Sequence, residues 1–534
     1  MQREVIEKFP CTVLLGWLLI FTFTQACVTT QSSPTPEQLN DQAQKYYNEA
    51  KYSEAESLFR EALAIREKNL GPEHPSVAIS LNNLAEIYRV LGKYSEAEGL
   101  YRRALAILQK EPGPEGPRVA TGLNNLAVLY RDLGRYAEAE PLFKRSLLIL
   151  EKQSGQENPS VATSLNNLAE LYRIQGKFAA AEPLYKRALT IDEKALGKDH
   201  PKVGTDLNNL GLLERDRGRY SAAEPLYRQA LSIVERALGP EHPSVAASLN
   251  NLATLNRDRG RYSESESLYR QAIVIYERVF GQKHSSVAMS LLSLAELYRE
   301  LNRYDDALPL YRQGLVIIEK VLGPEHPNTA SSLLDLSKLY RNQGRYDEAE
   351  KLIKRALAIF EKGGFNPAGA FNNLASLYTS QGKYKDAEPL YKKALTIREK
   401  LLGPEHPRVA ETLNDLAVLY DSLGKHLEAE KLYKRALAID EKVFGQDHPT
   451  VAMDLNNLAI LYDTQKNYDE AERLYKRALS IWENTLGSEP LHVAANLENY
   501  AALLQATNRE SEAAKLLARA QMIRAKYVNQ GAAK

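Results

Sequence analysis

The chain has 534 residues, of which 44% are hydrophobic and 26% are charged, as in ordinary folded proteins. Its 69 Lys and Arg nearly balance 68 Asp and Glu, and the net charge of +1 argues against nucleic-acid binding by bulk electrostatic attraction. The only two cysteines, Cys11 and Cys27, lie near the start, which excludes disulfides and thiolate sites from the rest of the chain.

Residues 1–26 have the pattern of an export signal. A weakly basic start precedes an apolar run over residues 11–23, which has the length of a signal-peptide core and is short for a membrane span. The run ends at Ala26 and Cys27. A small residue before a cysteine resembles the lipobox of bacterial lipoproteins, although Thr24 stands where that family usually has Leu. The resemblance implies a signal peptide over residues 1–26 and a lipid on Cys27; plain cleavage after Ala26 and an uncleaved anchor are the alternatives.

Residues 27–36 are rich in Ser, Thr and Pro, a composition typical of an extended linker. Such a linker would hold the following domain just off a membrane. We therefore expect an exported, membrane-anchored lipoprotein of the cell envelope that faces the periplasm or the cell surface. All three interpretations of the leader predict export.

From residue 37 onward, near copies of the motif Leu-Asn-Asn-Leu-Ala recur at an interval of 42 residues. A constant period of this size indicates a solenoid of stacked units, each in contact with its neighbours. The interval shrinks once, to 38 residues, where Gly363-Gly364 replaces a longer connection. We expect two blocks of repeats, residues 37–362 and 363–528, joined at a hinge, and a tail over residues 529–534. The first asparagine position of the motif falls at residues 40, 82, 124, 166, 208, 250, 292, 334, 372, 414, 456 and 498, which gives twelve units.

Each unit is expected to be a helical hairpin. Leu81, Leu84 and Tyr88 follow the i, i+3, i+7 spacing of one helix face, and Gly92 is typical of the turn that ends such a helix. A second apolar face with helical spacing follows over residues 97–108. Two helices joined by a short turn pack against each other within each unit.

The start of the second helix and the spacing of its small residues point to a known repeat. Ser95 and Glu98 are spaced as a capping box, which predicts the beginning of this helix. The pattern across the unit resembles the tetratricopeptide repeat, whose small residues let neighbouring helices approach closely. It runs Leu84-Ala85-(x)2-Tyr88-(x)3-Gly92-(x)4-Ala97-(x)3-Tyr101-(x)2-Ala104. The resemblance implies an all-α, right-handed superhelical solenoid of about twelve helical hairpins.

The long period narrows this resemblance. Tetratricopeptide repeats usually have about 34 residues, whereas the 42-residue unit with its Leu-Gly-Pro-Glu-His-Pro connection resembles the repeats of kinesin light chain and its bacterial relatives. The heptad coiled coil through which kinesin light chain carries the motor heavy chain has no counterpart in this sequence. No motor heavy chain is therefore expected as a partner.

Histidine recurs in the connections between units, mostly before proline. Each unit supplies one histidine without a second ligand at a chelating spacing, so we interpret the series as helix caps and not as metal ligands. Proline after the histidine suits the first position of a helix, and Asn158 holds the equivalent place before Pro159. The series is His74, His200, His242, His284, His326, His406 and His448.

The asparagine pair of the motif is the main candidate for ligand binding. In a tetratricopeptide superhelix the first helix of each unit lines a concave groove, and an amide side chain can donate to and accept from a peptide main chain of any sequence. The alternative is that these asparagines bond neighbouring helices to one another. The candidates are Asn82, Asn83, Asn124, Asn125, Asn166, Asn167, Asn208, Asn209, Asn250, Asn251, Asn372, Asn373, Asn456 and Asn457.

Arginine occupies another inner position in seven consecutive units, and the same position then holds Thr379, Asp421 and Asp463. A basic track could bind carboxylates or phosphates, because the guanidinium group offers a planar fork of donors. The alternative is that nearby acids such as Glu86 and Asp132 neutralise it, which leaves specificity or steering and no large affinity. The series is Arg89, Arg131, Arg173, Arg215, Arg257, Arg299 and Arg341.

No phosphate loop, zinc-protease motif or nucleophile elbow is present, so no enzymatic activity, cofactor or metal is expected. We predict a protein–protein interaction scaffold of the cell envelope that binds an extended peptide or a partner protein in its concave groove. Two alternatives remain: a module that binds an envelope polysaccharide, and a structural part of a larger envelope assembly that acts through its convex faces.

Overall fold

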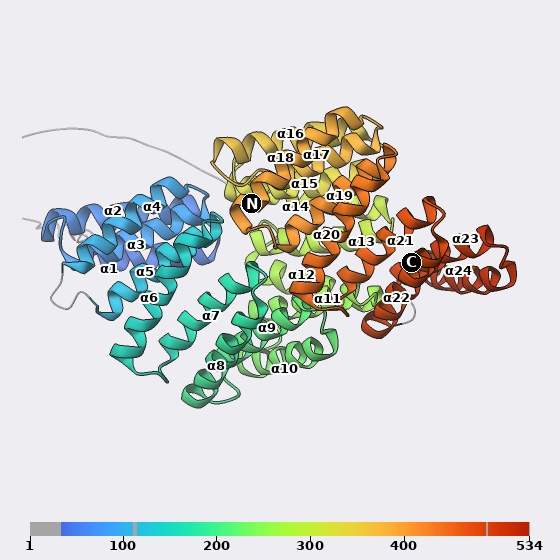
Figure 1. Cartoon of the computed structure of the whole chain (residues 1–534). Helices are drawn as coiled ribbons and strands as arrows, with labels where there is room; N and C mark the ends of the chain where they lie inside the picture. Colours follow the sequence, from blue (N-terminus) through green and yellow to red (C-terminus); the bar gives the residue numbers. More distant parts are fainter. Residues whose placement is uncertain (1–33, 111–114, 488–489, 533–534) are drawn as a thin grey trace, which may run out of the picture. The chain divides into compact units, whose positions relative to one another are not determined.

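The computed structural model describes residues 34–110, 115–487 and 490–532, and the predicted signal peptide and lipidation site at Cys27 lie outside them. The described residues contain 24 helices and no strand, which confirms the all-α prediction (Figure 1). The repeat array, Pro36–Lys534, is a compact unit of its own. None of the helices in the described part of the chain has both the length and the apolar character needed to span a bilayer.

The helices pair in chain order, and each odd-numbered helix and the even-numbered helix after it make one of the twelve predicted hairpin units. Their bounds are α1 Pro36–Asn48, α2 Tyr52–Leu70, α3 Pro75–Val90, α4 Tyr94–Gln109, α5 Pro117–Asp132, α6 Tyr136–Ser154, α7 Pro159–Ile174, α8 Phe178–Leu196, α9 Pro201–Asp216, α10 Tyr220–Leu238, α11 Pro243–Asp258, α12 Tyr262–Phe280, α13 Ser285–Glu300, α14 Tyr304–Leu322, α15 Pro327–Asn342, α16 Tyr346–Lys362, α17 Ala368–Ser380, α18 Tyr384–Leu402, α19 Pro407–Ser422, α20 His426–Phe444, α21 Pro449–Thr464, α22 Tyr468–Leu486, α23 Leu491–Ala506 and α24 Glu510–Ala532.

A tight turn joins the two helices of each unit. In unit 2 it contains Gly92 at φ +72°, a left-handed conformation that favours glycine, and the Lys93 N–H donates to the Tyr88 carbonyl at 2.8 Å. The second helix starts at the next residue, with Lys93 as its N-cap and no side-chain cap. The predicted capping box of Ser95 and Glu98 is therefore wrong, because the backbone bonds of the turn already fix the start of the helix.

The core repeats from unit to unit and runs along the array. Ala85 and Ala97 are 0% exposed and let the two helices of a unit approach closely, while Leu84 fills the space beside them. Burying one leucine side chain contributes about 1.5–3 kcal/mol. The fully buried Tyr101 directs its hydroxyl to Glu86, to which it donates at 2.9 Å. Unit 2 therefore combines apolar packing with a polar bond that joins its two helices, and units 4 and 7 have the equivalent bond from Tyr185 to Glu170 and from Tyr311 to Glu296.

The histidine series caps the first helices as predicted. In units 2 and 8, for example, the Nδ1 atoms of His74 and His326 accept the N–H of the second residue after them, at 3.1 and 3.0 Å. All seven histidines make this bond, and Asn158 makes the equivalent bond through its side-chain oxygen at 2.9 Å. The cap prediction is confirmed.

Units that lie six places apart in the array are in contact with each other. We call units 1–6 (α1–α12) the N-terminal half, units 7–12 (α13–α24) the C-terminal half, and the contacts between them the seam. At the seam the hairpin turn of one unit meets the connection that precedes the unit six places later. The Nε2 atoms of His326 and His406 lie 3.0 Å from the carbonyl oxygens of Val90 and Ile174, respectively. The Tyr527 hydroxyl donates to the Gly260 carbonyl at 3.2 Å.

The shortened connection between units 8 and 9 interrupts the seam. A Cβ atom built on Gly92 or Gly218 would meet His326 or His448 at 2.9 or 2.5 Å, whereas one on Gly134 of unit 3 would have no neighbour within 4 Å. Unit 9, which lies six places after unit 3, begins with the short α17 and has no histidine cap. A gap therefore opens in the seam beside unit 3.

Candidate functional site

The first helices of successive units line a groove. One cavity of about 290 Å³ in this groove is formed only by residues of α11, α13 and α15, among them Arg257, Ser293 and Asp335. Ser293 and Asp335 occupy the second asparagine position in the two units that lack the asparagine pair. The structure thus places the second position of the motif on the groove.

The first asparagine position bonds neighbouring units. Asn166 donates to Asp206 at 2.6 Å, Asn208 to Ser248 at 3.0 Å and Asn250 to Ser290 at 2.8 Å, in each case across to the first helix of the next unit. Asn372 donates to Asp415 at 2.7 Å. Asn124 and Asn456 accept from the next unit, and the Asn82 oxygen is buried without a partner in the described structure.

The second asparagine position remains available in most units. Asn167 donates to Asn124 at 2.8 Å. The other second-position side chains are partly exposed, and none of them makes a side-chain hydrogen bond within the described residues. These side chains are Asn83, Asn125, Asn209, Asn251, Asn373 and Asn457. The two asparagines of the motif therefore differ in units 5 and 6: Asn208 and Asn250 donate to the next unit, whereas Asn209 and Asn251 are partly exposed and make no side-chain hydrogen bond within the described residues.

The arginine series is mostly neutralised. Arg89 bonds Glu86 at 2.6 Å and also reaches Asp132, while Arg131 bonds Asp132 at 2.9 Å. The same pattern recurs in later units: Arg173 bonds Glu170 and Asp216, Arg215 and Arg257 bond Asp258, and Arg299 bonds Glu296. An arginine of one unit thus often pairs with the acid of the next, and these pairs hold adjacent first helices together.

The pKa of a carboxylate in these pairs reflects its arginine partner. Burial acts to raise the pKa of Glu296, but the hydrogen bonds and charge of Arg299 outweigh it and lower this pKa to about 2. Tyr311 also donates to Glu296, at 2.6 Å. Because Glu86, Glu170 and Glu296 are each held by an arginine and a tyrosine, this part of the inner surface carries little net charge for a ligand.

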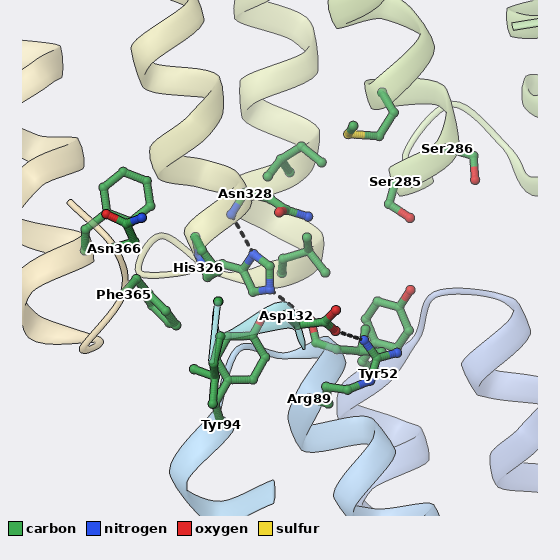
Figure 2. Close-up of a pocket in the computed structure, with 18 of the residues that line it drawn as sticks. Tyr52, Arg89, Tyr94, Asp132, Ser285, Ser286, His326, Asn328, Phe365 and Asn366 are labelled. Atoms are coloured by element: carbon green, nitrogen blue, oxygen red, sulfur yellow. Dashed lines mark hydrogen bonds and ion pairs between the residues drawn. The ribbon is translucent and has the colours of Figure 1, made fainter. Parts of the chain in front are cut away.

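A cavity of about 740 Å³ lies at the seam, beside the gap at unit 3 (Figure 2). Figure 2 shows Arg89, Tyr94 and Asp132 from the N-terminal half facing residues of the C-terminal half. Phe365 packs edge-on against Tyr94, with ring centroids 5.3 Å apart. The cavity combines aromatic walls with a paired arginine and is large enough for a short peptide segment.

Sequence reasoning did not predict this seam cavity. Its walls come from units six places apart, and a repeat period gives the contacts of neighbours without giving the number of units in a superhelical turn. The only signal was the shortened connection at Gly363-Gly364, which we predicted as a hinge and which here coincides with the interrupted seam. Its action as a hinge stays a prediction.

Among the residues that the structure describes, no group of three or more His, Cys, Asp or Glu side chains is placed to hold a metal ion. Perturbed carboxylates of the inner surface such as Glu170 and Glu296 are paired with arginine, as structural groups are. The chemistry on offer is hydrogen bonding along a groove and enclosure in a cavity.

The model of the tetratricopeptide repeat family matches the chain over nearly its whole described length, and the chain belongs to this family. Arrays of this family are typically non-catalytic scaffolds that bind proteins or peptides. No curated protein matches the sequence. The matched segments are residues 39–110, 118–194, 160–236, 207–278, 244–316, 286–362, 367–442, 422–484 and 450–525.

Several solved structures are similar. The nearly identical repeats of a kinesin light chain from Podosopora anserina share 29% identity over 39% of this chain and 98% of that one, with a TM-score of 0.33. BtubC (BKLC) from P. vanneervenii shares 23% identity over 43% of this chain and 91% of its own, with a TM-score of 0.34. Yeast Tom70 shares 16% identity over 89% of this chain and 96% of its own, with a TM-score of 0.42.

Proposed function

We propose that this protein is an interaction scaffold that holds an extended segment of a partner protein along the groove of its first helices. The observation that carries the proposal is the division within the asparagine pair. Amides such as Asn125 and Asn209 are partly exposed and unbonded within the described residues, while Asn166 and Asn208 are bonded to the next unit. An amide that both donates and accepts suits a peptide main chain.

The array supports an extended ligand better than a compact one. The second asparagine position recurs once per unit, so its amides form a row along consecutive first helices. A row of equivalent groups at a regular spacing can bind the repeated donors and acceptors of a peptide backbone. The ion-paired arginines contribute orientation to such a ligand and little affinity.

The experiment compares two triple variants. Replacing Asn125, Asn209 and Asn251 with Ala should lower partner capture at least tenfold in a crosslinking pull-down from intact cells with mass identification, and the helical circular dichroism should not change. The matched replacement of Asn166, Asn208 and Asn250 with Ala should instead lower the midpoint of thermal unfolding, because it removes bonds between units. Unchanged capture by the first variant would sink the groove proposal.

We further propose that the scaffold works in the cell envelope, as a lipoprotein anchored through Cys27. The support is the sequence of the leader, in which an apolar run ends at a small residue before this cysteine. Incorporation of radiolabelled palmitate should be lost in a Cys27→Ala variant. Retained label would refute the anchor.

A further inference from the structure

Arg341 differs from the six other arginines of its series. Each of the others has a carboxylate within 4.0 Å, whereas Arg341 has no ion pair in the described part of the chain and donates only to the Ser376 hydroxyl. Two local sequence changes cause this difference. The acid three residues before the arginine, Glu296 in the preceding unit, is Lys338 here, and the acid that the next unit supplies elsewhere is replaced by Ser380.

The surroundings of Arg341 supply donors where the other units supply acids. Arg341 lines a groove cavity of about 370 Å³ between units 8 and 9, together with Tyr346, Ser376, Thr379 and Ser380. Hydroxyl groups can turn their hydrogens toward an acceptor, and a guanidinium group offers a planar fork of N–H donors. The Thr379 and Ser380 hydroxyls already donate to the carbonyls of Ala375 and Ser376, both at 2.9 Å, so the donors that the cavity offers are the Arg341 cation and the hydroxyls of Ser376 and Tyr346.

The positive charge of Arg341 is partly buried without an ion-pair partner in the described residues. Its side chain is partly buried, and burial lowers the pKa of Arg341, with only a partial offset from the charge of Asp415. Asp415 is the carboxylate that lines the cavity, and it already accepts from Asn372 at 2.7 Å. A partly buried cation without a paired anion is costly, and an anion that entered the cavity would remove that cost.

We propose that the Arg341 cavity binds an oxyanion, a carboxylate or a phosphate group carried by the segment held in the groove. The identity of the carrier rests on the proposed scaffold function, but the binding of the anion itself does not. The fork of Arg341 takes two oxygens of the anion, and the hydroxyls of Ser376 and Tyr346 donate to the remaining ones. This site fixes the register of an otherwise sequence-tolerant groove, because it is the position in the arginine series that lacks a carboxylate partner in the described residues.

The test measures binding of radiolabelled inorganic phosphate by equilibrium dialysis at constant ionic strength and pH 7.5. The native chain should bind one phosphate, and Arg341→Gln should weaken binding at least tenfold. Arg345→Gln is the matched control, because it removes the same charge from a nearby residue that lies beyond the end of α15, as the N-cap of α16, and is paired at the surface with Glu348. This variant should bind phosphate as the native chain does. Asp415→Asn should bind several-fold more tightly, because it removes the competing carboxylate.

Competition with acetate distinguishes the two sources of the anion. Displacement of phosphate by acetate assigns the site to carboxylates as well, and no displacement assigns it to phosphate groups. Equal binding by the native chain and Arg341→Gln, with circular dichroism showing both folded, would overturn the proposal, as would equal losses in Arg341→Gln and Arg345→Gln. The Asn125, Asn209 and Asn251 variant should keep its phosphate, so failure of the groove proposal is seen separately.

Discussion

The N-terminal and C-terminal halves of the array use the same residues in different surroundings. His200 and His448 occupy the same repeat position six units apart, and each caps its own helix, with Nδ1 accepting a backbone N–H at 3.2 and 3.0 Å. His200 is exposed, whereas His448 is 8% exposed and lies against Gly218 of the other half. The local sequence determines that each histidine caps its helix, whereas the superhelix determines what else the imidazole ring contacts.

The seam gives the buried histidines a second function. Because Nδ1 already accepts an N–H, the neutral ring carries its proton on Nε2, and in His326 and His406 this group donates to a carbonyl at the end of a first helix six units earlier. That carbonyl belongs to the unsatisfied end of its helix. One imidazole therefore satisfies a donor at the start of one helix and an acceptor at the end of another.

The largest expected effect separates these two uses of histidine. Asparagine can keep the cap, as Asn158 does, but its side chain is too short to reach across the seam. Replacing His326, His406 and His448 with Asn should cost about 1–3 kcal/mol at each site, because buried carbonyls lose their donor. The same replacement of His74, His200 and His242 should cost little. Urea unfolding followed by circular dichroism measures both variants.

The pH dependence sharpens this comparison. Burial lowers the pKa of His326 and of His448 to about 4, below the value of about 6.5 expected in the unfolded chain. The unfolded chain therefore binds more protons between these values, so the stability from the seam histidines is fully present above pH 6.5 and is lost as the pH falls toward 4. The difference between the native chain and the seam variant should shrink over this range; a constant difference would contradict the seam assignment.

The hairpin units and the seam were not equally predictable. Residues such as Leu84 and Tyr101 interact within one unit or with the next, so their spacing in the sequence already defines the contact. His406 and Ile174 are 232 residues apart, and their contact depends on a small rotation that accumulates over six units. A period of 42 residues does not contain that rotation.

The candidate site was also predictable only in part. Its residue types and its helix followed from the motif, and the neutralisation of the arginines followed from acids such as Asp132 beside them. The difference between Asn208 and Asn209 did not follow, because adjacent positions on a helix differ by about 100° and the twist of the stack decides which one meets the next unit.

A second comparison concerns two buried carboxyl pairs. Asp192 and Asp206 join units 4 and 5, and Asp440 and Asp454 join units 10 and 11 at the same repeat positions; all four side chains are at most 2% exposed. Lys202 lies 3.3 Å from Asp192, whereas the equivalent position in the C-terminal half is a threonine. The C-terminal pair thus lacks this lysine.

Asp454→Asn should therefore stabilise the array at alkaline pH. Burial, together with the neighbouring carboxyl, raises the pKa of Asp440, and burial raises that of Asp454. The folded state holds protons that the unfolded chain has lost, so the stability contributed by the pair falls as the pH rises above about 4. The gain at pH 9 should be on the order of 2 kcal/mol in urea unfolding, with less for Asp206→Asn and little for either at pH 4.5. Equal gains in both halves would show that Lys202 does not matter.

The smallest expected effect tests the gap in the seam with two glycines of the N-terminal half. Gly134 and Gly218 have φ angles of +73° and +68°, so an alanine at either costs about 1–2 kcal/mol in the left-handed conformation. At Gly218 the new methyl group would also lie 2.5 Å from a ring carbon of His448 and 2.9 Å from Pro449, whereas at Gly134 it meets nothing within 4 Å.

Gly218→Ala should therefore lower the unfolding midpoint more than Gly134→Ala, by the equivalent of a further 1–3 kcal/mol, roughly, for overpacking at the seam. The backbone cost is shared by both variants, so their difference isolates the contact between the halves. In a chain without the seam the two alanines would cost the same, and that result would also remove the physical reason for the gap beside unit 3.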